Sequence, residues 1–241
     1  MQALLLAAGL GTRLKPLTLS KPKALVEVAG KPLLAHTLET LERYGADKVV
    51  VNIHHHAEQI KAYLSDYKSK AEILISDESG MLLETGGALR KAQTLFDQER
   101  PVLIHNVDIM SRADLGAFYE EAFKHDALLM VSARKTQRYL LFDENRRLVG
   151  WTNIATGEVR SPYEDLDVER CEKLAFAGIH ACSPRLFPLM SEFPDRFSII
   201  DFYLKVCRDV VIKAYYPEGL DLLDVGKLES LVEAERFVRV K

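Results

Sequence analysis

The sequence has little cysteine and no long apolar run. Its 241 residues include three cysteines, Cys171, Cys182 and Cys207, which are too few and too far apart for a disulfide framework or a thiolate metal site. The longest apolar run, residues 3–8, is far shorter than the roughly 20 residues of a membrane span, and it lacks the basic flank and cleavage site of a signal peptide. We therefore expect buried thiols, no membrane partner and a cytoplasmic location.

An excess of positive charge is also missing. The 32 Lys and Arg residues stand against 35 Asp and Glu residues, which gives a net charge of −3. Without a global positive field, we do not expect nucleic acid as a partner. The 13 glycines and 9 prolines are scattered singly, so no linker is apparent, and 48% of the residues are hydrophobic. This composition predicts one domain, residues 1–241, with a sizeable core.

Apolar strands alternate with amphipathic helices through the first half of the chain. Strand patterns lie at 3–8, 48–53, 72–76 and 101–105, and helical spacing lies at 34–44, 60–64, 89–96 and 115–123. Near-continuous apolar strands covered by helices on both faces are typical of an α/β fold with a doubly wound, mostly parallel, Rossmann-like sheet. Ligands of such sheets bind beyond the carboxyl ends of the strands.

The second half begins with a hairpin pattern. Residues 139–143 and 148–151 are apolar and flank a polar turn. Residues 153–173 are polar and aperiodic, which predicts an exposed loop at the rim of a site. The remaining patterns predict strands at 174–182 and 210–216 and helices at 184–190, 199–208 and 227–238.

The strongest chemical signal is a small-residue loop after the first strand. Gly9 and Gly11 let backbone N–H groups approach phosphate oxygens because glycine has no Cβ, and Arg13 and Lys23 add positive charge. A P-loop is excluded because its consensus is absent, and a dinucleotide fingerprint is excluded because Leu14 stands where its third glycine belongs. The cations that follow favour phosphate binding over a simple turn.

Residues 6–13, with 16–18 and 21–25, closely resemble the signature of the sugar-1-phosphate nucleotidylyltransferases. The resemblance continues in order at Leu83-Glu84-Thr85-Gly86-Gly87, Asn106-Val107-Asp108, Phe176-Ala177-Gly178-Ile179 and Asp224-Val225-Gly226. The sequence ends after one more helix, without the β-helix of bifunctional members. It is therefore similar to the short single-domain type represented by bacterial N-acetylmuramate-1-phosphate uridylyltransferases.

The resemblance implies that a sugar 1-phosphate oxygen attacks the α-phosphorus of a nucleoside triphosphate, with pyrophosphate as the leaving group. A phosphate monoester has a second pKa of about 6, so the attacking oxygen needs no general base at neutral pH. Because both reactants are anions, the site needs cations and positioned donors. The resemblance assigns catalysis to Arg13, Lys23 and Asp108. It assigns nucleotide binding to Ala8, Gly9, Gly11, Thr12, Glu78, Gly80, Gly86 and Gly87.

Two acids are candidate ligands for Mg²⁺. Asp108 ends an apolar strand, where an unpaired carboxylate would cost several kcal/mol, so it needs a partner or a cation. By resemblance, Asp108 and Asp224 bind the metal, and carboxylates with phosphate oxygens and waters suit Mg²⁺. Helix capping is the alternative for Asp224 alone. We expect the neighbouring Asp221 to cap the helix or to lie in solvent.

The sugar side departs from the family pattern. Many relatives carry a lysine near residues 148–153 that binds the sugar phosphate, and this sequence has none there. Lys173 is a substitute only if the preceding segment folds back. A second departure is Val107, where many relatives have glycine. The sugar-binding candidates are Glu84, Trp151, Asn153 and Gly178. We expect residues 1–125 to form a nucleotide-binding half and residues 126–241 a sugar-binding half.

The nucleobase is left open by the residues themselves. Asp77 and Glu78 can accept hydrogen bonds from guanine or cytosine, whereas residues 84–87 and the opening motif resemble those of uridylyl- and thymidylyltransferases. We therefore expect UTP or dTTP, with a mannose- or heptose-1-phosphate guanylyltransferase as the alternative. A phosphocholine cytidylyltransferase is a further alternative, with Tyr139, Trp151 and Tyr163 as an aromatic cage. An alternative of another class is a non-catalytic nucleotide-sugar binding protein. The oligomeric state is not indicated.

Overall fold

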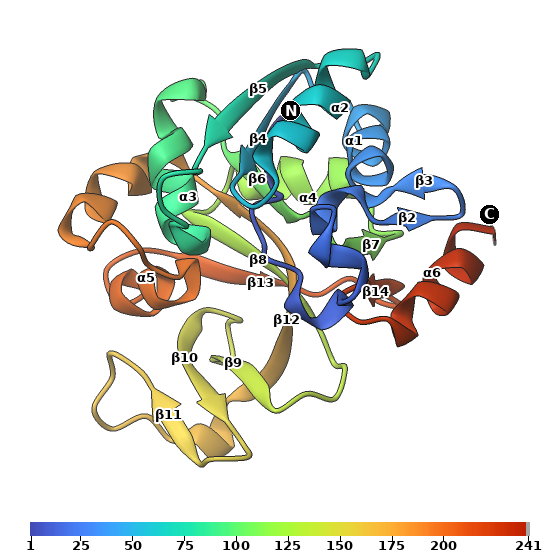
Figure 1. Cartoon of the computed structure of the whole chain (residues 1–241). Coiled ribbons are helices and arrows are strands. Elements are labelled where there is room, and N and C mark those ends of the chain that lie inside the picture. The colour runs from blue at the N-terminus through green and yellow to red at the C-terminus, as the bar shows by residue number, and fades with distance from the viewer. Residues whose placement is uncertain (240–241) are drawn as a thin grey trace.

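The computed structural model describes residues 1–239 and has a ten-stranded mixed sheet at its centre (Figure 1). The main path of the sheet is β11-β10-β9-β12-β6-β1-β4-β5, and β8 pairs with β12 and β13 beside it. The strands of this sheet are β1 (Gln2–Leu6), β4 (Lys48–Ile53), β5 (Glu72–Asp77), β6 (Val102–Asn106), β8 (Ala127–Ser132), β9 (Arg138–Phe142), β10 (Leu148–Asn153), β11 (Glu158–Arg160), β12 (Glu172–Cys182) and β13 (Ile212–Tyr215). Two short ladders pair β2 (Glu27–Val28) with β3 (Lys31–Pro32), and β7 (Ile109–Ser111) with β14 (Leu222–Asp224).

Strands β6, β1, β4 and β5 lie side by side and run parallel. Leu6, in β1, is level with Asn52 in β4 and with Asn106 in β6. Asn52 is in turn level with Ser76 in β5. All four carboxyl ends therefore meet at one edge of the sheet, which is where ligands of such sheets bind.

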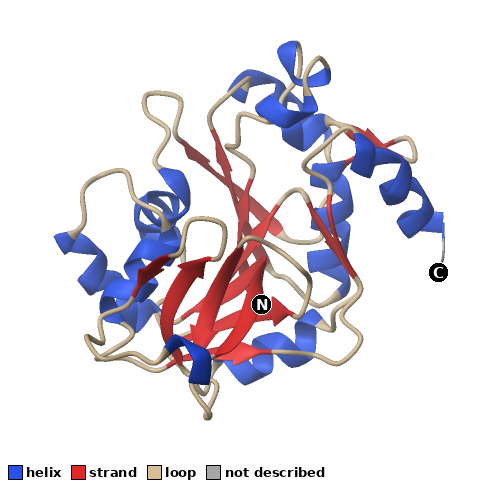
Figure 2. Cartoon of the chain, turned by 90° about the horizontal axis from the view of Figure 1, so that it is seen from below, coloured by secondary structure: helices blue, strands red, loops and turns tan. Residues whose placement is uncertain are grey.

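Alternate residues of the central strands enter two cores on opposite faces of the sheet. In β1, Ala3 and Leu5 belong to one core and Leu4 to the other, as the two-residue period of a strand requires. Helices α1, α2 and α4 cover the first core, and α3, α5 and η6 cover the second, so Figure 2 shows helices on both sides of the strands. The helices are α1 (Leu33–Arg43), α2 (Ala57–Asp66), α3 (Glu84–Ala92), α4 (Leu115–Ala122), α5 (Ile199–Val206), α6 (Glu229–Arg239) and the 3-10 helix η6 (Pro184–Glu192).

The parallel pattern ends at β12, which runs antiparallel to both β6 and β9. Strands β9, β10 and β11 form an antiparallel unit that lies apart from the parallel half in Figure 1. The expectation of a loop over 153–173 is wrong in part, because Glu158–Arg160 form β11 and Val168–Arg170 form a 3-10 turn. A three-residue edge strand is too short to show a two-residue period in the sequence.

The predicted fold class is confirmed: helices flank a large sheet whose central strands are parallel. The two short ladders were not predicted, because strands of two or three residues leave no periodic pattern. Cys182 and Cys207 are buried as expected, but Cys171 is only partly buried, so that expectation is wrong. Within residues 1–239, no helix combines the length and the apolar character needed to cross a membrane. The division into halves 1–125 and 126–241 stays a prediction.

Candidate functional site

A cavity of about 410 Å³ opens where the parallel strands end. It is bordered by the loops that follow β1, β5 and β6 and by the first turn of α3. Six residues predicted from the sequence border it: Ala8, Gly9, Lys23, Glu78, Glu84 and Asp108. Polar side chains that the sequence analysis missed also border it: Asn52, Thr85, Asn106 and Ser198. The structure thus brings six of the candidates together at the predicted edge of the sheet, whereas Arg13 and Asp224 do not border this cavity.

The loop after β1 returns Lys23 to the end of its own strand. Gly11 has a left-handed φ of 61°, and a Cβ there would lie 2.8 Å from Thr18 Cγ2 and 3.0 Å from Lys23 Cβ. The Thr18 hydroxyl donates to the Gly11 carbonyl at 2.8 Å. A Cβ on Gly9 would meet no described atom within 4 Å. Gly11 therefore closes the loop, whereas Gly9 exposes its backbone to the cavity.

Lys23 and Asp108 form an ion pair at the floor of the cavity. The Lys23 ammonium donates to Asp108 Oδ2, and the two side chains are only 11% and 15% exposed. The pairing satisfies the need of Asp108 for a partner at the end of an apolar strand. It also keeps a cation and a carboxylate next to each other, where each neutralises the other until a ligand competes.

Asp224 comes close to Asp108 through the β7–β14 ladder. Asp224 is level with Ile109, and the N–H of Val225 donates to the Asp108 carbonyl at 2.8 Å. Asp224 Oδ1 is buried and has no hydrogen-bond partner among residues 1–239. A Cβ on Gly226 would lie 2.6 Å from that oxygen and 2.7 Å from Arg13 Nη2. The tight turn at Gly226 therefore holds the carboxylate and the guanidinium near one another.

These two acids fit a divalent cation bound together with substrate. A buried carboxylate oxygen without a donor among residues 1–239 has the chemistry of a hard-cation ligand, and the backbone of Asp108 is hydrogen-bonded to the residue that follows Asp224. Within the described part of the chain, no group of three or more acidic, histidine or cysteine residues could enclose a metal. Further ligands would therefore have to be phosphate oxygens or water. Asp221 behaves differently, since it pairs with Arg112 at 3.3 Å and is about half exposed.

Asn52 and Glu78 form a buried bridge in the cavity wall. Asn52 Oδ1 accepts from the N–H groups of Ala7 and Ala8 at 2.6 and 3.3 Å, and its amide nitrogen donates to Glu78 Oε1 at 2.8 Å. Glu78 Oε2 accepts from the N–H of Leu83 at 3.2 Å. Burial raises the pKa of the Glu78 carboxyl above its ordinary value. An asparagine at the end of an apolar strand is the sequence signal that could have identified Asn52.

The first turn of α3 contains a strained residue and two packing glycines. Glu84 has a left-handed φ of 62°, and Arg196 Nε donates to its carboxylate at 2.8 Å. The N–H groups of Gly86 and Gly87 donate to the Phe197 carbonyl, and a Cβ on Gly86 would lie 2.3 Å from the Phe197 ring. Packing therefore requires Gly86 there, and neither glycine borders the cavity.

Other predicted residues lie outside the cavity wall. Thr12 and Gly80 are exposed. Gly178 has a φ of 76° and touches the site indirectly, because a Cβ there would lie 2.9 Å from the Asn106 amide nitrogen. Trp151 lies beneath the Arg160 guanidinium at 4.1 Å. The predicted sugar side is thus represented at the cavity by Glu84.

The side chains of the remaining sugar-side candidates interact with nearby residues of the chain. Asn153 Oδ1 accepts from the N–H of Ala155 at 3.1 Å within a turn. Lys173 pairs with Glu169 at 2.9 Å, so the preceding segment does not bring it to the cavity. The aromatic cage lacks support as well, because the Arg160 side chain covers a face of Trp151.

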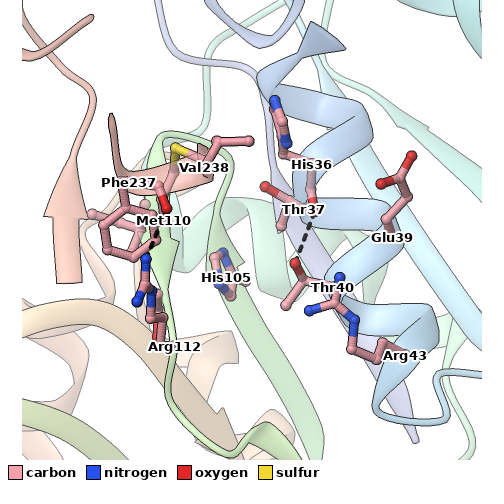
Figure 3. Close-up of a pocket in the computed structure, with 12 residues that line it drawn as sticks. His36, Thr37, Glu39, Thr40, Arg43, His105, Met110, Arg112, Phe237 and Val238 are labelled. Atoms are coloured by element: carbon pink, nitrogen blue, oxygen red, sulfur yellow. Dashed lines mark hydrogen bonds between the residues drawn. The ribbon is translucent and has the colours of Figure 1, made fainter. Parts of the chain in front are cut away.

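A second cavity, of about 510 Å³, lies between α1, β7 and α6 (Figure 3). None of the predicted site residues borders it. Arg112 donates to the Phe237 carbonyl at 2.8 Å and stacks over that ring at 4.7 Å. His105 lies at its base between α1 and β7, and burial lowers the pKa of this histidine to about 4. This cavity is the larger of the two, but the residue chemistry concentrates at the strand ends.

The sequence is also similar to known proteins. Residues 2–146 match the family model described as nucleotidyl transferase. The chain is similar to N-acetylmuramate alpha-1-phosphate uridylyltransferase of Caulobacter vibrioides, with 33% identity over 247 residues that cover 97% of this chain and 95% of that protein. It is also similar to mannose-1-phosphate guanylyltransferase 1 of Arabidopsis thaliana, with 39% identity over 137 residues, which are 55% of this chain and 38% of that one.

Solved structures share the fold. A UDP-glucose pyrophosphorylase complexed with UDP-glucose superimposes with a TM-score of 0.77 at 17% sequence identity. The superposition covers 98% of this chain and 97% of that one. At this level of identity, the likeness extends to the fold alone.

Proposed function

The chain belongs to the nucleotidyl transferase family of sugar-1-phosphate nucleotidylyltransferases, and from this premise we propose that it joins a nucleoside triphosphate to a sugar 1-phosphate and releases pyrophosphate. The observation that carries the proposal is the meeting of Gly9, Lys23 and Asp108 in one cavity at the carboxyl edge of the sheet. An exposed backbone, a cation and an acid are what a polyphosphate site requires.

Each of these residues has a role in the proposed reaction. The Gly9 backbone approaches the phosphates, and Lys23 leaves Asp108 to neutralise charge on the α-phosphate as the sugar 1-phosphate oxygen attacks. Arg13, beside Gly226, stabilises the departing pyrophosphate. The attacking phosphate is already ionised at neutral pH, so no side chain has to remove a proton. Catalysis therefore rests on positioning and on charge neutralisation.

We further propose that the reaction depends on Mg²⁺. Asp108 and Asp224 would hold the ion, and the unpartnered Asp224 Oδ1 supports this assignment. A bound Mg²⁺ supplies positive charge that screens the two anionic reactants from each other. If Asp108 held the ion, the Lys23 ammonium, which pairs with Asp108 here, would be available to the phosphates.

UTP is the proposed nucleotide, with GTP as the second candidate. Each Glu78 oxygen already accepts one hydrogen bond from the protein, and the residue is only 1% exposed, so this carboxylate offers guanine little acceptor surface. The uridylyltransferase relative of Caulobacter vibrioides supports the pyrimidine. The mannose-1-phosphate guanylyltransferases among the relatives keep the purine as a candidate.

The test is release of pyrophosphate with Mg²⁺, each nucleoside triphosphate in turn and a panel of sugar 1-phosphates. We expect turnover with at least one pair, and the fastest turnover with UTP. Phosphocholine with CTP is included to test the alternative acceptor. Tight nucleotide-sugar binding without pyrophosphate release would identify a binding protein instead. If folded protein released no pyrophosphate with any pair of the panel, the result would contradict the proposal.

A further inference from the structure

Strand order arranges the cavity in a line along the sheet edge. Asp108 follows β6, Gly9 follows β1, Asn52 lies in β4 and Glu78 follows β5. Adjacent strands lie about 4.8 Å apart, so the line from β6 to β5 is roughly 15 Å long. Its β6 end carries the Lys23–Asp108 pair and suits phosphates. If the proposed function holds, the nucleoside extends toward the β5 end, where Asn52 and Glu78 lie.

The polar groups of the bridge at this end have fixed donor and acceptor roles. Asn52 is 3% exposed and Glu78 is 1% exposed. One Asn52 group must accept, because it faces the N–H groups of Ala7 and Ala8, and the other must donate to Glu78. Both Glu78 oxygens must accept, because they face the Asn52 amide and the N–H of Leu83. The bridge therefore ties the backbone after β1 to the backbone before α3.

We propose that Asn52 and Glu78 are positioning residues that fix these two backbone segments around the nucleoside end of the bound nucleotide. This inference rests on the proposed function and adds residues that act through the backbone instead of touching the reacting atoms. The bridge is held rigid because Asn52 and Glu78 are both buried and are joined by four hydrogen bonds to each other and to the backbone. The bridge lies at the opposite end of the line from the Lys23–Asp108 pair, so a change in the bridge should affect binding of the nucleoside more than binding of pyrophosphate.

The bridge predicts that each single substitution lowers nucleotide affinity and that the double substitution restores it. Glu78→Gln replaces one acceptor by a donor, so one donor must face another donor, whichever way the amides turn. Asn52→Asp places a second carboxylate against Glu78. The double variant Asn52→Asp/Glu78→Gln restores every contact: the new aspartate accepts from Ala7, Ala8 and the new glutamine, whose carbonyl accepts from Leu83. Total charge is unchanged, because the negative charge only moves from position 78 to position 52.

The experiment is calorimetric titration of native protein, both single variants and the double variant. The ligand is the nucleoside triphosphate that native protein binds most tightly of the four, without sugar 1-phosphate, and inorganic pyrophosphate is titrated separately. The control is Asn145→Asp/Glu144→Gln, the same exchange in the exposed turn between β9 and β10. Thermal unfolding of each variant is recorded alongside.

We expect triphosphate affinity to fall at least about fivefold in each single variant and to return to within about threefold of native in the double variant. We expect pyrophosphate affinity to stay within about twofold throughout, which a general structural defect would not allow. Single variants that bind like native protein, or a folded double variant without recovery, would overturn the inference. If a single variant fails to fold, the double variant tests the inference by itself. Native-like affinity of the double variant would support the inference, and a loss of affinity beyond about tenfold would overturn it. Native protein that binds no nucleotide would overturn the proposed function itself.

Discussion

The carboxyl edge of the parallel strands and the antiparallel unit β9–β11 contain similar polar residues in different states. At the parallel edge, Gly9 faces open space and the Lys23 ammonium pairs with the Asp108 carboxylate, while Asp224 Oδ1, in the short β7–β14 ladder beside this edge, has no partner among residues 1–239. In the antiparallel unit, Asn153 is held in a turn. The edge beside β1 and β6 therefore keeps polar groups that a ligand can reach, whereas Asp143 and Asn153 of the antiparallel unit are held by their sequence neighbours.

Strand direction explains the difference. Parallel strands send all their carboxyl ends to one edge, where the polar residues that end them meet far from their own sequence neighbours. Antiparallel strands joined by short turns place polar residues beside sequence neighbours, and these satisfy them: the Asp143 side chain accepts from the N–H groups of Asn145 and Arg147 at 2.9 and 2.8 Å. The predictions below test this contrast.

The largest effect is expected at Asp108. Asp108→Asn removes the negative charge beside Lys23 and a proposed Mg²⁺ ligand, so kcat/KM for pyrophosphate release should fall at least about a thousandfold. Asp143→Asn, an acid of the antiparallel unit, is the control and should change kcat/KM by less than about twofold. Equal effects from both variants would show that the two regions do not differ as argued.

The two acids near Gly226 come next. Asp224→Asn should lower kcat/KM about a hundredfold and raise the Mg²⁺ concentration needed for half-maximal rate, because this carboxylate is a proposed Mg²⁺ ligand and its buried oxygen has no hydrogen-bond partner among residues 1–239. Asp221→Asn is the matched control, since that side chain pairs with Arg112. The Mg²⁺ dependence of the steady-state rate measures both variants. If only Asp221→Asn changed the Mg²⁺ dependence of the rate, the metal ligand would be Asp221 and not Asp224.

Two glycines, one in the cavity wall and one outside it, test how far the binding surface extends. Gly9→Ala adds a methyl group at an open position beside the cavity, so the KM for the nucleoside triphosphate should rise about tenfold while the melting temperature changes little. Gly80→Ala also adds a methyl group in open space, but outside the cavity wall, and should leave the KM within about twofold. A larger effect at Gly80 would extend the binding surface beyond the cavity.

The pH dependence of stability tests whether the two regions unfold together. Burial lowers the pKa of His105, in β6, to about 4, and that of His180, in β12, to about 3. Below pH 6.5, these two histidines bind protons in the unfolded chain but stay neutral in the folded protein. The free energy of unfolding is therefore highest above pH 6.5 and decreases as the pH falls below that value. The loss should be about 2 kcal/mol for each histidine between pH 7 and pH 5. Urea unfolding at both pH values measures it. Two separate transitions at pH 5 would mean that β12 does not join the regions cooperatively.

The smallest effect on catalysis is expected in the antiparallel unit. Asn153→Ala removes a turn hydrogen bond, so stability should fall by about 1 kcal/mol while the KM for sugar 1-phosphate stays within about twofold. Steady-state kinetics and urea unfolding measure the two quantities. A large rise in that KM would return Asn153 to the sugar site, as the sequence suggested, and would weaken the contrast between the regions.

The sequence by itself determined the alternation of strands and helices, the edge of the sheet at which ligands of such folds bind, and the loop that carries Gly9 and Lys23. These features depend on residue periodicity and on glycine and proline placement, which act over a few neighbouring residues. The family signature added Asp108 and Asp224 as a pair, although 116 positions of sequence separate residues 108 and 224.

Only the tertiary structure decided which candidates share a cavity. The three-residue β7–β14 ladder brings Asp224 close to Asp108. Gly86 packs against Phe197, and Asn52 donates a hydrogen bond to Glu78 across neighbouring strands. Such contacts depend on strand order and on the partners left over after local hydrogen bonds form. Sequence spacing contains neither, because the energy of a buried polar group is set by what the rest of the fold places next to it.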